Sequence, residues 1–182
     1  KAPVKFSNGF NPHLVMTIGL PLSVGTTSEC DVLDIELTED VDTIKFMESL
    51  NNTCPDGIRI TAVKQAEGLK PLHLIDSAIY IAHFNTNCDI DIQKFIDAPE
   101  VLIEKKSKRG LNMVNIKDFI RSIEQWESHK KYGVKMHINA GNFSNLKPEL
   151  VLTAMGEYLG FEATDIEICR KQIFFDNGES VF

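Results

Sequence analysis

The chain has 182 residues, and its 19 Lys and Arg against 26 Asp and Glu give a formal net charge of −7. Apolar residues make up 43% and charged residues 25%, as in ordinary soluble globular proteins. This composition excludes a long disordered tail, a collagen-like repeat and a mucin-like stalk. No apolar run approaches the roughly 20 residues that a membrane-spanning helix needs, so we expect no membrane-spanning segment.

The start of the sequence and its cysteines indicate the cellular compartment of the protein. The first residue is Lys1, and no charged region followed by an apolar run marks a secretory signal there. We expect that an upstream piece of the native protein precedes it. The four cysteines lie far apart, without the close ligand pair that zinc and iron–sulfur sites usually have. We therefore expect reduced thiols in a cytoplasmic protein, with neither a bound metal nor a cofactor.

The N-terminal part of the chain predicts a pair of strands. Residues 14–20 form a short apolar run, and residues 32–37 alternate in the way that is typical of a half-buried strand. Pro21 and Gly25 favour turns in the segment between them. We expect an antiparallel hairpin with a long connection.

A helix and a third strand are predicted next. Apolar residues recur at three-residue steps over residues 41–50, which indicates an amphipathic helix that Asp40 or Asp42 can cap. Alternation over residues 58–63 then predicts a strand.

The rest of the chain predicts strands and helices in a similar order. Helices are expected over residues 89–98, with Pro99 just beyond the end, and over residues 146–159, where Pro148 suits the first turn and Gly160 ends the helix. Strands are expected over residues 77–84, 101–105, 121–127, 134–139 and 165–175.

These elements predict an α+β fold in which helices cover antiparallel sheets. Their order suits two tandem ferredoxin-like (split βαβ) halves. We expect the first half over residues 1–68, lacking its initial strand and helix, and the second half over residues 69–182.

One motif near the N-terminus is specific enough to suggest a family. Residues 6–37 read FSNGFNPHLVMTIGLPLSVGTTSECDVLDIEL. The motif residues in this segment are Phe6, Ser7, Gly9, Phe10, Asn11, Pro12, His13, Pro21, Gly25, Ser28 and Glu29. The pattern resembles the signature of the radical-SAM-linked proteins, a bacterial family of unknown function. Weaker matches to that family follow at residues 108–110, at residues 145–149 and at Arg170.

The resemblance implies a partner. Members of that family occur fused to, or encoded beside, a radical S-adenosylmethionine (SAM) enzyme, so a radical SAM enzyme is the implied partner. Family members also begin with a strand and a helix carrying an SHLDL motif, which is absent here, and they tend to have Arg and Pro where this chain has Lys117 and Asp118. Radical chemistry needs a cluster-binding cysteine triplet, so this chain is not the radical enzyme itself.

The SNGFNPH motif predicts an exposed loop. Gly9 permits a positive φ, Asn11 before a proline favours a turn, and His13 is the titratable residue of the loop. The functional interpretation is a surface that binds a ligand or partner through Asn8, Gly9, Phe10, Asn11 and His13. The alternative is a shaped turn whose polar side chains satisfy their own backbone.

Charge is distributed unevenly along the chain. Residues 105–135 hold nine basic and three acidic residues, a net charge of +6, with Trp126 and Tyr132 among them. Basic residues interleaved with aromatic ones can bind nucleic acid. The candidate nucleic-acid patch consists of Lys105, Lys106, Lys108, Arg109, Lys130 and Lys131. The alternative is a solvated edge, since lysines on edge strands discourage aggregation.

Two functions stay open from the sequence. The sequence contains no nucleophile elbow, P-loop or dinucleotide-binding motif. This favours an accessory module that presents a substrate, with RNA as a candidate, to a radical SAM enzyme. The alternative is an enzyme whose active site is completed by the missing N-terminal segment, with His13 as acid or base.

Overall fold

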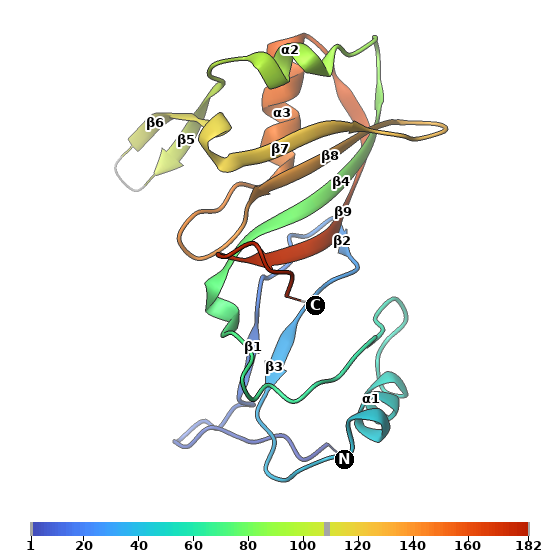
Figure 1. Cartoon of the computed structure of the whole chain (residues 1–182), viewed down its shortest axis with the longest axis vertical. Coiled ribbons are helices and arrows are strands. Elements are labelled where there is room, and N and C mark those ends of the chain that lie inside the picture. The colour runs from blue at the N-terminus through green and yellow to red at the C-terminus, as the bar shows by residue number, and fades with distance from the viewer. Residues whose placement is uncertain (1, 108–109, 182) are drawn as a thin grey trace. The chain divides into compact units, whose positions relative to one another are not determined.

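The computed structural model describes residues 2–107 and 110–181 and divides the chain into two compact units (Figure 1). Unit 1 consists of Lys1–Gly19 and Val32–Leu72. Unit 2 consists of Leu20–Asp31 and His73–Phe182. The chain therefore leaves unit 1, contributes one segment to unit 2, returns, and then completes unit 2.

Unit 1 is built on a narrow antiparallel ribbon. Strands β1 (Met16–Ile18) and β3 (Leu33–Ile35) pair with Thr17 opposite Asp34. Residues 4–6 extend the ribbon, because Val4 bridges to Leu37 and Phe6 bridges to Leu14. The predicted antiparallel pairing of these two strands is confirmed.

Helix α1 (Thr43–Asn51) follows the ribbon. The Asp42 side chain accepts hydrogen bonds from the backbone N–H groups of Ile44 and Lys45, both at 3.0 Å, as an N-cap does. The strand predicted over residues 58–63 is wrong. Asn51 explains why: its side-chain amide donates to Ile60 O at 2.9 Å and accepts from Ile60 N at 2.8 Å. A side chain thus takes the hydrogen bonds that a neighbouring strand would have taken.

Unit 2 is built on a five-stranded sheet. In order across the sheet, the strands are β2 (Thr26–Ser28), β9 (Ala163–Phe175), β4 (Ile75–Thr86), β8 (Tyr132–Asn139) and β7 (Ile120–Trp126). Neighbouring strands from β9 to β7 are antiparallel, whereas β2 lies parallel to β9. Most of these strands follow the predicted ranges, but β2 was not predicted, because three residues are too few to show a pattern.

Two helices complete the second unit, and both are predicted ones. They are α2 (Ile92–Asp97) and α3 (Pro148–Leu159). Pro148 begins α3, and Gly160 ends it in the left-handed region at a φ of 76°. None of the helices in residues 2–107 and 110–181 combines the length and the apolar composition that crossing a bilayer requires.

The prediction of an α+β fold with antiparallel sheets is confirmed. In unit 2 the elements β4, α2, β7, β8, α3 and β9 follow one another as strand, helix, strand, strand, helix, strand. This succession is the one expected for the second ferredoxin-like half. The tandem of two such halves stays a prediction, and we retain the boundary between residues 68 and 69 as a proposal.

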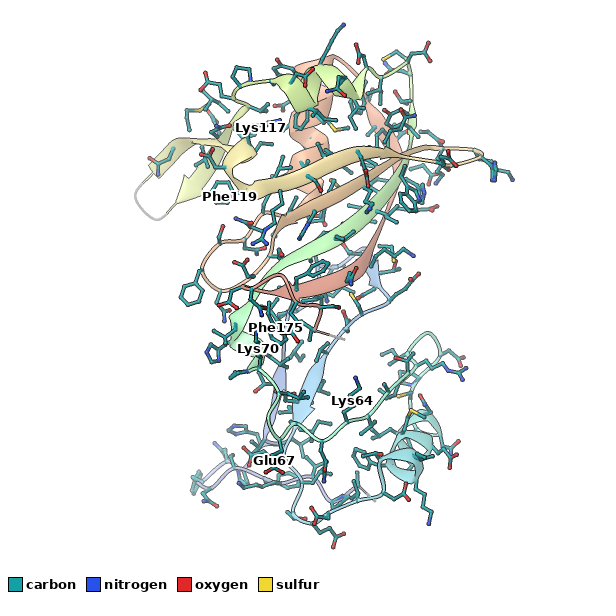
Figure 2. The ribbon with its side chains drawn as sticks, in the orientation of Figure 1. Lys64, Glu67, Lys70, Lys117, Phe119 and Phe175 are labelled. Atoms are coloured by element: carbon teal, nitrogen blue, oxygen red, sulfur yellow. The ribbon has the colours of Figure 1, made fainter. Side chains whose placement is uncertain are left out.

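A short hairpin interrupts this succession. It consists of β5 (Leu102–Ser107) and β6 (Gly110–Asn115), followed by the 3₁₀ turn η2 (Ile116–Phe119). A further 3₁₀ turn, η1 (Leu72–Leu74), precedes β4. Lys117 of η2, labelled in Figure 2, donates to the carbonyl oxygens of Phe95 at 3.0 Å and Ile96 at 2.8 Å. Burial lowers the pKa of this lysine, whose ammonium caps the end of α2.

The two faces of the sheet differ. Ala78 and Tyr80 of β4 belong to the same buried cluster as Val151 and Met155 of α3, so this face carries the core. Side chains alternate along a strand. Ile79 and Ile81 of β4 therefore lie on the opposite face, together with their cross-strand partners His137 and Lys135. Trp126, the last residue of β7, lies on this face as well.

Candidate functional site

The SNGFNPH motif forms the tip of a hairpin in unit 1. Ser7 N donates to His13 O at 2.7 Å, and His13 N donates to Ser7 Oγ at 3.0 Å. The same Ser7 hydroxyl lies 3.0 Å from His13 Nδ1, so the imidazole is fixed by the residue across the hairpin. Gly9 has a φ of +136°, which residues with a side chain rarely adopt. The tip is therefore a closed, internally bonded turn.

Apolar side chains project from this tip into solvent. Phe10 is 100% exposed, and Phe6 and Leu14, which bridge across the hairpin, are 57% and 41% exposed. Asn8, Gly9, Asn11 and His13 are exposed as well. Single exposed apolar side chains are ordinary on a protein surface, whereas several gathered in one place are typical of a binding surface.

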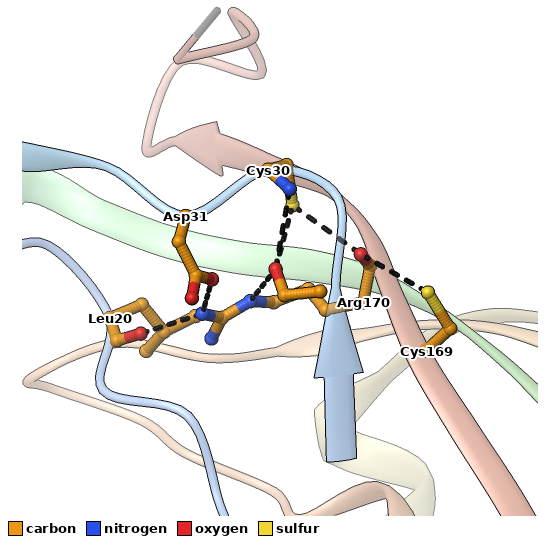
Figure 3. A network of polar contacts seen from close by, with 6 residues as sticks. Leu20, Cys30, Asp31, Cys169 and Arg170 are labelled. Carbon is orange, nitrogen blue, oxygen red and sulfur yellow. Dashed lines mark hydrogen bonds and ion pairs between the residues drawn. The ribbon is translucent and has the colours of Figure 1, made fainter. Parts of the chain in front are cut away.

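A buried charge network lies in unit 2. Arg170 of β9 is 1% exposed, and its guanidinium donates to Leu20 O at 2.8 Å and to Ser28 Oγ at 3.4 Å (Figure 3). The same guanidinium forms an ion pair with Asp31. A buried charge is tolerated when it is paired and hydrogen-bonded. Segment 20–31 supplies these partners, so Arg170 holds that segment against β9.

Two cysteines flank the backbone of the same residue. The thiols of Cys30 and Cys169 lie 3.7 Å and 3.8 Å from the carbonyl oxygen of Arg170 (Figure 3). Burial raises the pKa of the Cys30 thiol, which keeps it protonated. Cys30, Cys54, Cys88 and Cys169 are free thiols.

A small pocket adjoins the Arg170 network. Its volume is about 50 Å³, and it is lined by Leu20, Pro21, Leu22, Ser23, Thr26, Tyr80, Asn145, Leu146, Lys147 and Pro148. Burial raises the pKa of Tyr80. Thr26 Oγ1 donates to Glu149 Oε1 at 3.3 Å, and Glu149 Oε2 is buried without a hydrogen-bond partner among the described residues. The pocket brings together motif residues far apart in sequence, but its volume holds one or two waters rather than an organic ligand.

A larger groove lies at the turn between β7 and β8. Its volume is about 720 Å³, and it is lined by Thr86, Gln125, Trp126, Glu127, Ser128, His129, Lys130, Lys131, Tyr132 and Gly133. Two residues of the predicted nucleic-acid patch, Lys130 and Lys131, are therefore placed beside Trp126. This volume lies in the range of ligand-binding sites.

Several cations of the basic stretch are engaged by acidic groups. Lys131 forms ion pairs with Asp165 at 2.7 Å and Glu167 at 2.8 Å, and its hydrogen bonds to these carboxylates raise its pKa. Lys135 forms an ion pair with Glu124 at 2.7 Å. Arg121 pairs with Asp76. The stretch is thus less basic in the fold than its sequence indicates.

The described part of the chain places only two other members of the predicted patch, and only by their backbone. Lys105 and Lys106 lie in β5. Lys108 and Arg109 lie outside the described residues, as do the side chains of Lys105 and Lys106. Within the described residues, no group of three or more His, Cys, Asp and Glu side chains is arranged to hold a metal ion.

Residues 1–148 match the model of a family described as an uncharacterised protein conserved in bacteria (DUF2344). The chain belongs to this family. No curated protein and no solved structure matches the chain significantly. The resemblance to an uncharacterised bacterial family is therefore confirmed. The DUF2344 match includes the hairpin tip, segment 20–31 and the groove, and it ends at the first residue of α3.

Sequence reasoning missed three residues of these sites. Trp126 was noted only as a neighbour of the basic stretch, although it lies in the groove. Tyr80 lies in an alternating strand, where an aromatic side chain indicates only core packing. Glu149 lies in the first turn of a helix, where a carboxylate is ordinary. The single tryptophan of this DUF2344 chain was the one signal that could have directed attention to the groove.

The Arg170 network predicts the effect of removing its anion. Asp31→Asn keeps the size of the side chain but removes the charge that pairs with the buried guanidinium. We expect the free energy of unfolding to fall by about 1–3 kcal/mol, because Asp31 is partly exposed and water replaces part of the pairing. Urea denaturation measures the change. The exposed Asp89→Asn serves as the matched control and should stay within about 0.5 kcal/mol; equal losses in both variants would contradict the role of the ion pair.

His137 predicts a dependence of stability on pH. Its Nε2 lies 3.0 Å from the hydroxyl of the buried Ser77, and its ring centroid lies 5.0 Å from that of Phe174. Burial lowers the pKa of His137 below its ordinary 6.5, and the nearby Arg121 acts in the same direction. The unfolded chain then binds the proton more readily than the folded one. Stability is therefore full above pH 6.5 and falls as the pH decreases below that value.

The matched variant is His137→Gln, which keeps a hydrogen-bond partner for Ser77 but does not titrate. Urea denaturation of both proteins at about pH 7.5 and about pH 5.5 measures the effect. The wild type should lose more stability on acidification than the variant. An equal loss would show that other groups account for the acid sensitivity.

Proposed function

We propose that this DUF2344 protein is a non-catalytic accessory module that presents structured RNA to a partner radical SAM enzyme in the bacterial cytoplasm. The observation that carries the proposal is the hairpin tip of unit 1, a hydrogen-bonded turn with Phe10 fully exposed at its end. The suggested partner comes from the family resemblance of residues 6–37.

The hairpin tip suits a protein partner. Burying a fully exposed phenylalanine in a partner's pocket releases a large apolar surface from water. Because the tip is already closed by the Ser7–His13 hydrogen bonds, little conformational entropy is lost on docking. Asn8 and Asn11 beside Phe10 supply polar groups for the rim of such an interface.

The RNA part of the proposal depends on the basic stretch. Lys105 and Lys106 lie in β5, and Lys130 and Lys131 line the groove at the β7–β8 turn together with Trp126. RNA loops expose unpaired bases and phosphates together, so aromatic and basic side chains at one surface suit them. Because the rest of the chain is acidic, we expect RNA to contact only this local surface and not to wrap around the protein nonspecifically.

In the alternative function, this protein is itself an enzyme and His13 is its catalytic acid or base. In the structure the His13 imidazole contacts Ser7. An accessory role accounts for the exposed turn without requiring a pair of acid–base side chains. The two functions differ in what His13→Ala does.

Co-purification from the native cell tests the partner. Phe10→Ala in the full-length protein should lower recovery of the radical SAM enzyme by about 10-fold or more, as loss of an interface anchor does. Phe143→Ala is the matched control, because Phe143 is 87% exposed in a turn of unit 2. Unchanged recovery with Phe10→Ala would refute docking through the hairpin tip.

His13→Ala in the same full-length protein separates the two functions. The accessory module predicts that product formation by the partner persists when the complex still forms. Loss of turnover with unchanged complex formation and unchanged thermal stability would instead establish the enzyme.

Salt dependence tests the RNA contact. Replacing Lys105, Lys106, Lys108 and Arg109 by Gln should weaken RNA binding and reduce the slope of log affinity against log salt by about 3. Filter binding of RNA that co-purifies with the protein measures this slope. The control replaces two cations of unit 1, Lys45→Gln with Arg59→Gln. Absent or salt-insensitive binding by the wild type would refute the RNA part of the proposal.

A further inference from the structure

We infer that the groove at the β7–β8 turn binds one unpaired ribonucleotide, with its base stacked on Trp126. The inference rests on the proposed RNA-presenting function and assigns a binding mode to this groove. In this mode the groove binds the base by stacking, whereas the proposed role of the basic patch is to attract phosphates.

Trp126 is placed as a stacking surface. It is the last residue of β7, lines the groove and is 38% exposed. The ammonium of Lys135 lies 5.5 Å from the centre of its ring, so one face of the indole is occupied by a cation. A base entering the groove would therefore stack on the other face. Base–aromatic stacking tolerates any base, because every base has a flat π surface.

Gly133 fixes the position of Trp126. The two residues are cross-strand partners, and a Cβ atom on Gly133 would lie 2.4 Å from the carbonyl oxygen of Trp126. Only glycine permits this close approach of β8 to β7. The backbone of Trp126 therefore lies close against β8, and this contact positions its side chain in the groove.

The charges of the groove favour a short contact with the nucleic-acid backbone. Lys131 is paired with Asp165 and Glu167, and Lys135 with Glu124. Lys130 and His129 are exposed in the turn beside Trp126. Their placement suits one or two phosphates, so stacking supplies most of the affinity of the groove itself. We expect the groove to contribute about −1 to the slope of log affinity against log salt, in addition to the contribution of the other cations.

Single-stranded RNA fits these features better than a peptide does. The open face of a sheet in a β-α-β-β-α-β unit is a surface on which unpaired bases stack in RNA-binding domains. Trp126 ends β7 on that face, opposite the helices. An exposed indole beside Lys130 and His129 matches a base linked to a phosphate.

The single tryptophan of the chain makes the test direct. The full chain is titrated with an oligouridylate of about eight nucleotides, and its intrinsic fluorescence reports contact with Trp126. The second probe is an abasic oligoribonucleotide of the same length, which has the phosphates but no bases. We expect quenching and binding by the oligouridylate, with affinity for the abasic strand weaker by about 10-fold or more.

Two variants and a control complete the test, read by filter binding. Trp126→Ala should weaken oligouridylate binding by about 10-fold, and Trp126→Phe should retain most of it. Phe143→Ala, at an exposed aromatic residue outside the groove, should bind like the wild type. The comparison of the two probes needs no substitution, so it decides the question even where Trp126→Ala unfolds.

The outcomes separate this inference from the proposed function. Equal affinity for both probes, or unchanged binding by a folded Trp126→Ala, overturns the stacking site while RNA binding stands. Absence of RNA binding under all conditions overturns both. Fluorescence that responds to the radical SAM enzyme but not to RNA overturns the inference and assigns the groove to a protein segment.

Discussion

The guanidinium of Arg170 is buried and charged, and the course of the chain in unit 2 depends on satisfying it. Its partners are Leu20, Ser28 and Asp31, which lie 139 to 150 residues earlier in the sequence. These partners lie in the segment that leaves unit 1 after Gly19 and returns to it at Val32. The strands β1 and β3 pair across this excursion. One buried charge therefore holds segment 20–31 within unit 2.

The hairpin tip depends on a different and purely local principle. Ser7 and His13 close it through their backbone and side chains. Such a turn keeps its shape by hydrogen bonds rather than by a hydrophobic core, so its apolar side chains are not needed inside. This explains how Phe10 can be fully exposed in an ordered turn. The residue is free to take the partner-binding role that we propose for it.

The sequence predicted local features well and long-range ones poorly. The long strand β4 and helix α3 follow from periodicity, and the turn at residues 7–13 follows from its Gly, Asn and Pro, because these patterns arise between neighbours. Strand β2 was missed because its three residues are a strand only through parallel pairing with β9. The prediction of a strand over residues 58–63 was wrong because the side chain of Asn51 forms hydrogen bonds with the backbone N–H and C=O of Ile60. These two residues are nine positions apart, and no pattern within residues 58–63 shows their contact.

The same limit applies to charge and explains the character of the groove. The sequence of residues 105–135 is strongly basic. In the fold, however, Lys131 and Arg121 form ion pairs with acidic residues of β9 and β4, which lie outside this stretch of the sequence. Ion pairs of this kind cancel most of the long-range attraction for phosphate while holding the side chains in place. What the fold leaves at the β7–β8 turn is a tryptophan in a fixed position with a few exposed basic groups. In the binding mode that we propose, such a surface holds RNA by flat apolar contact first and by charge second.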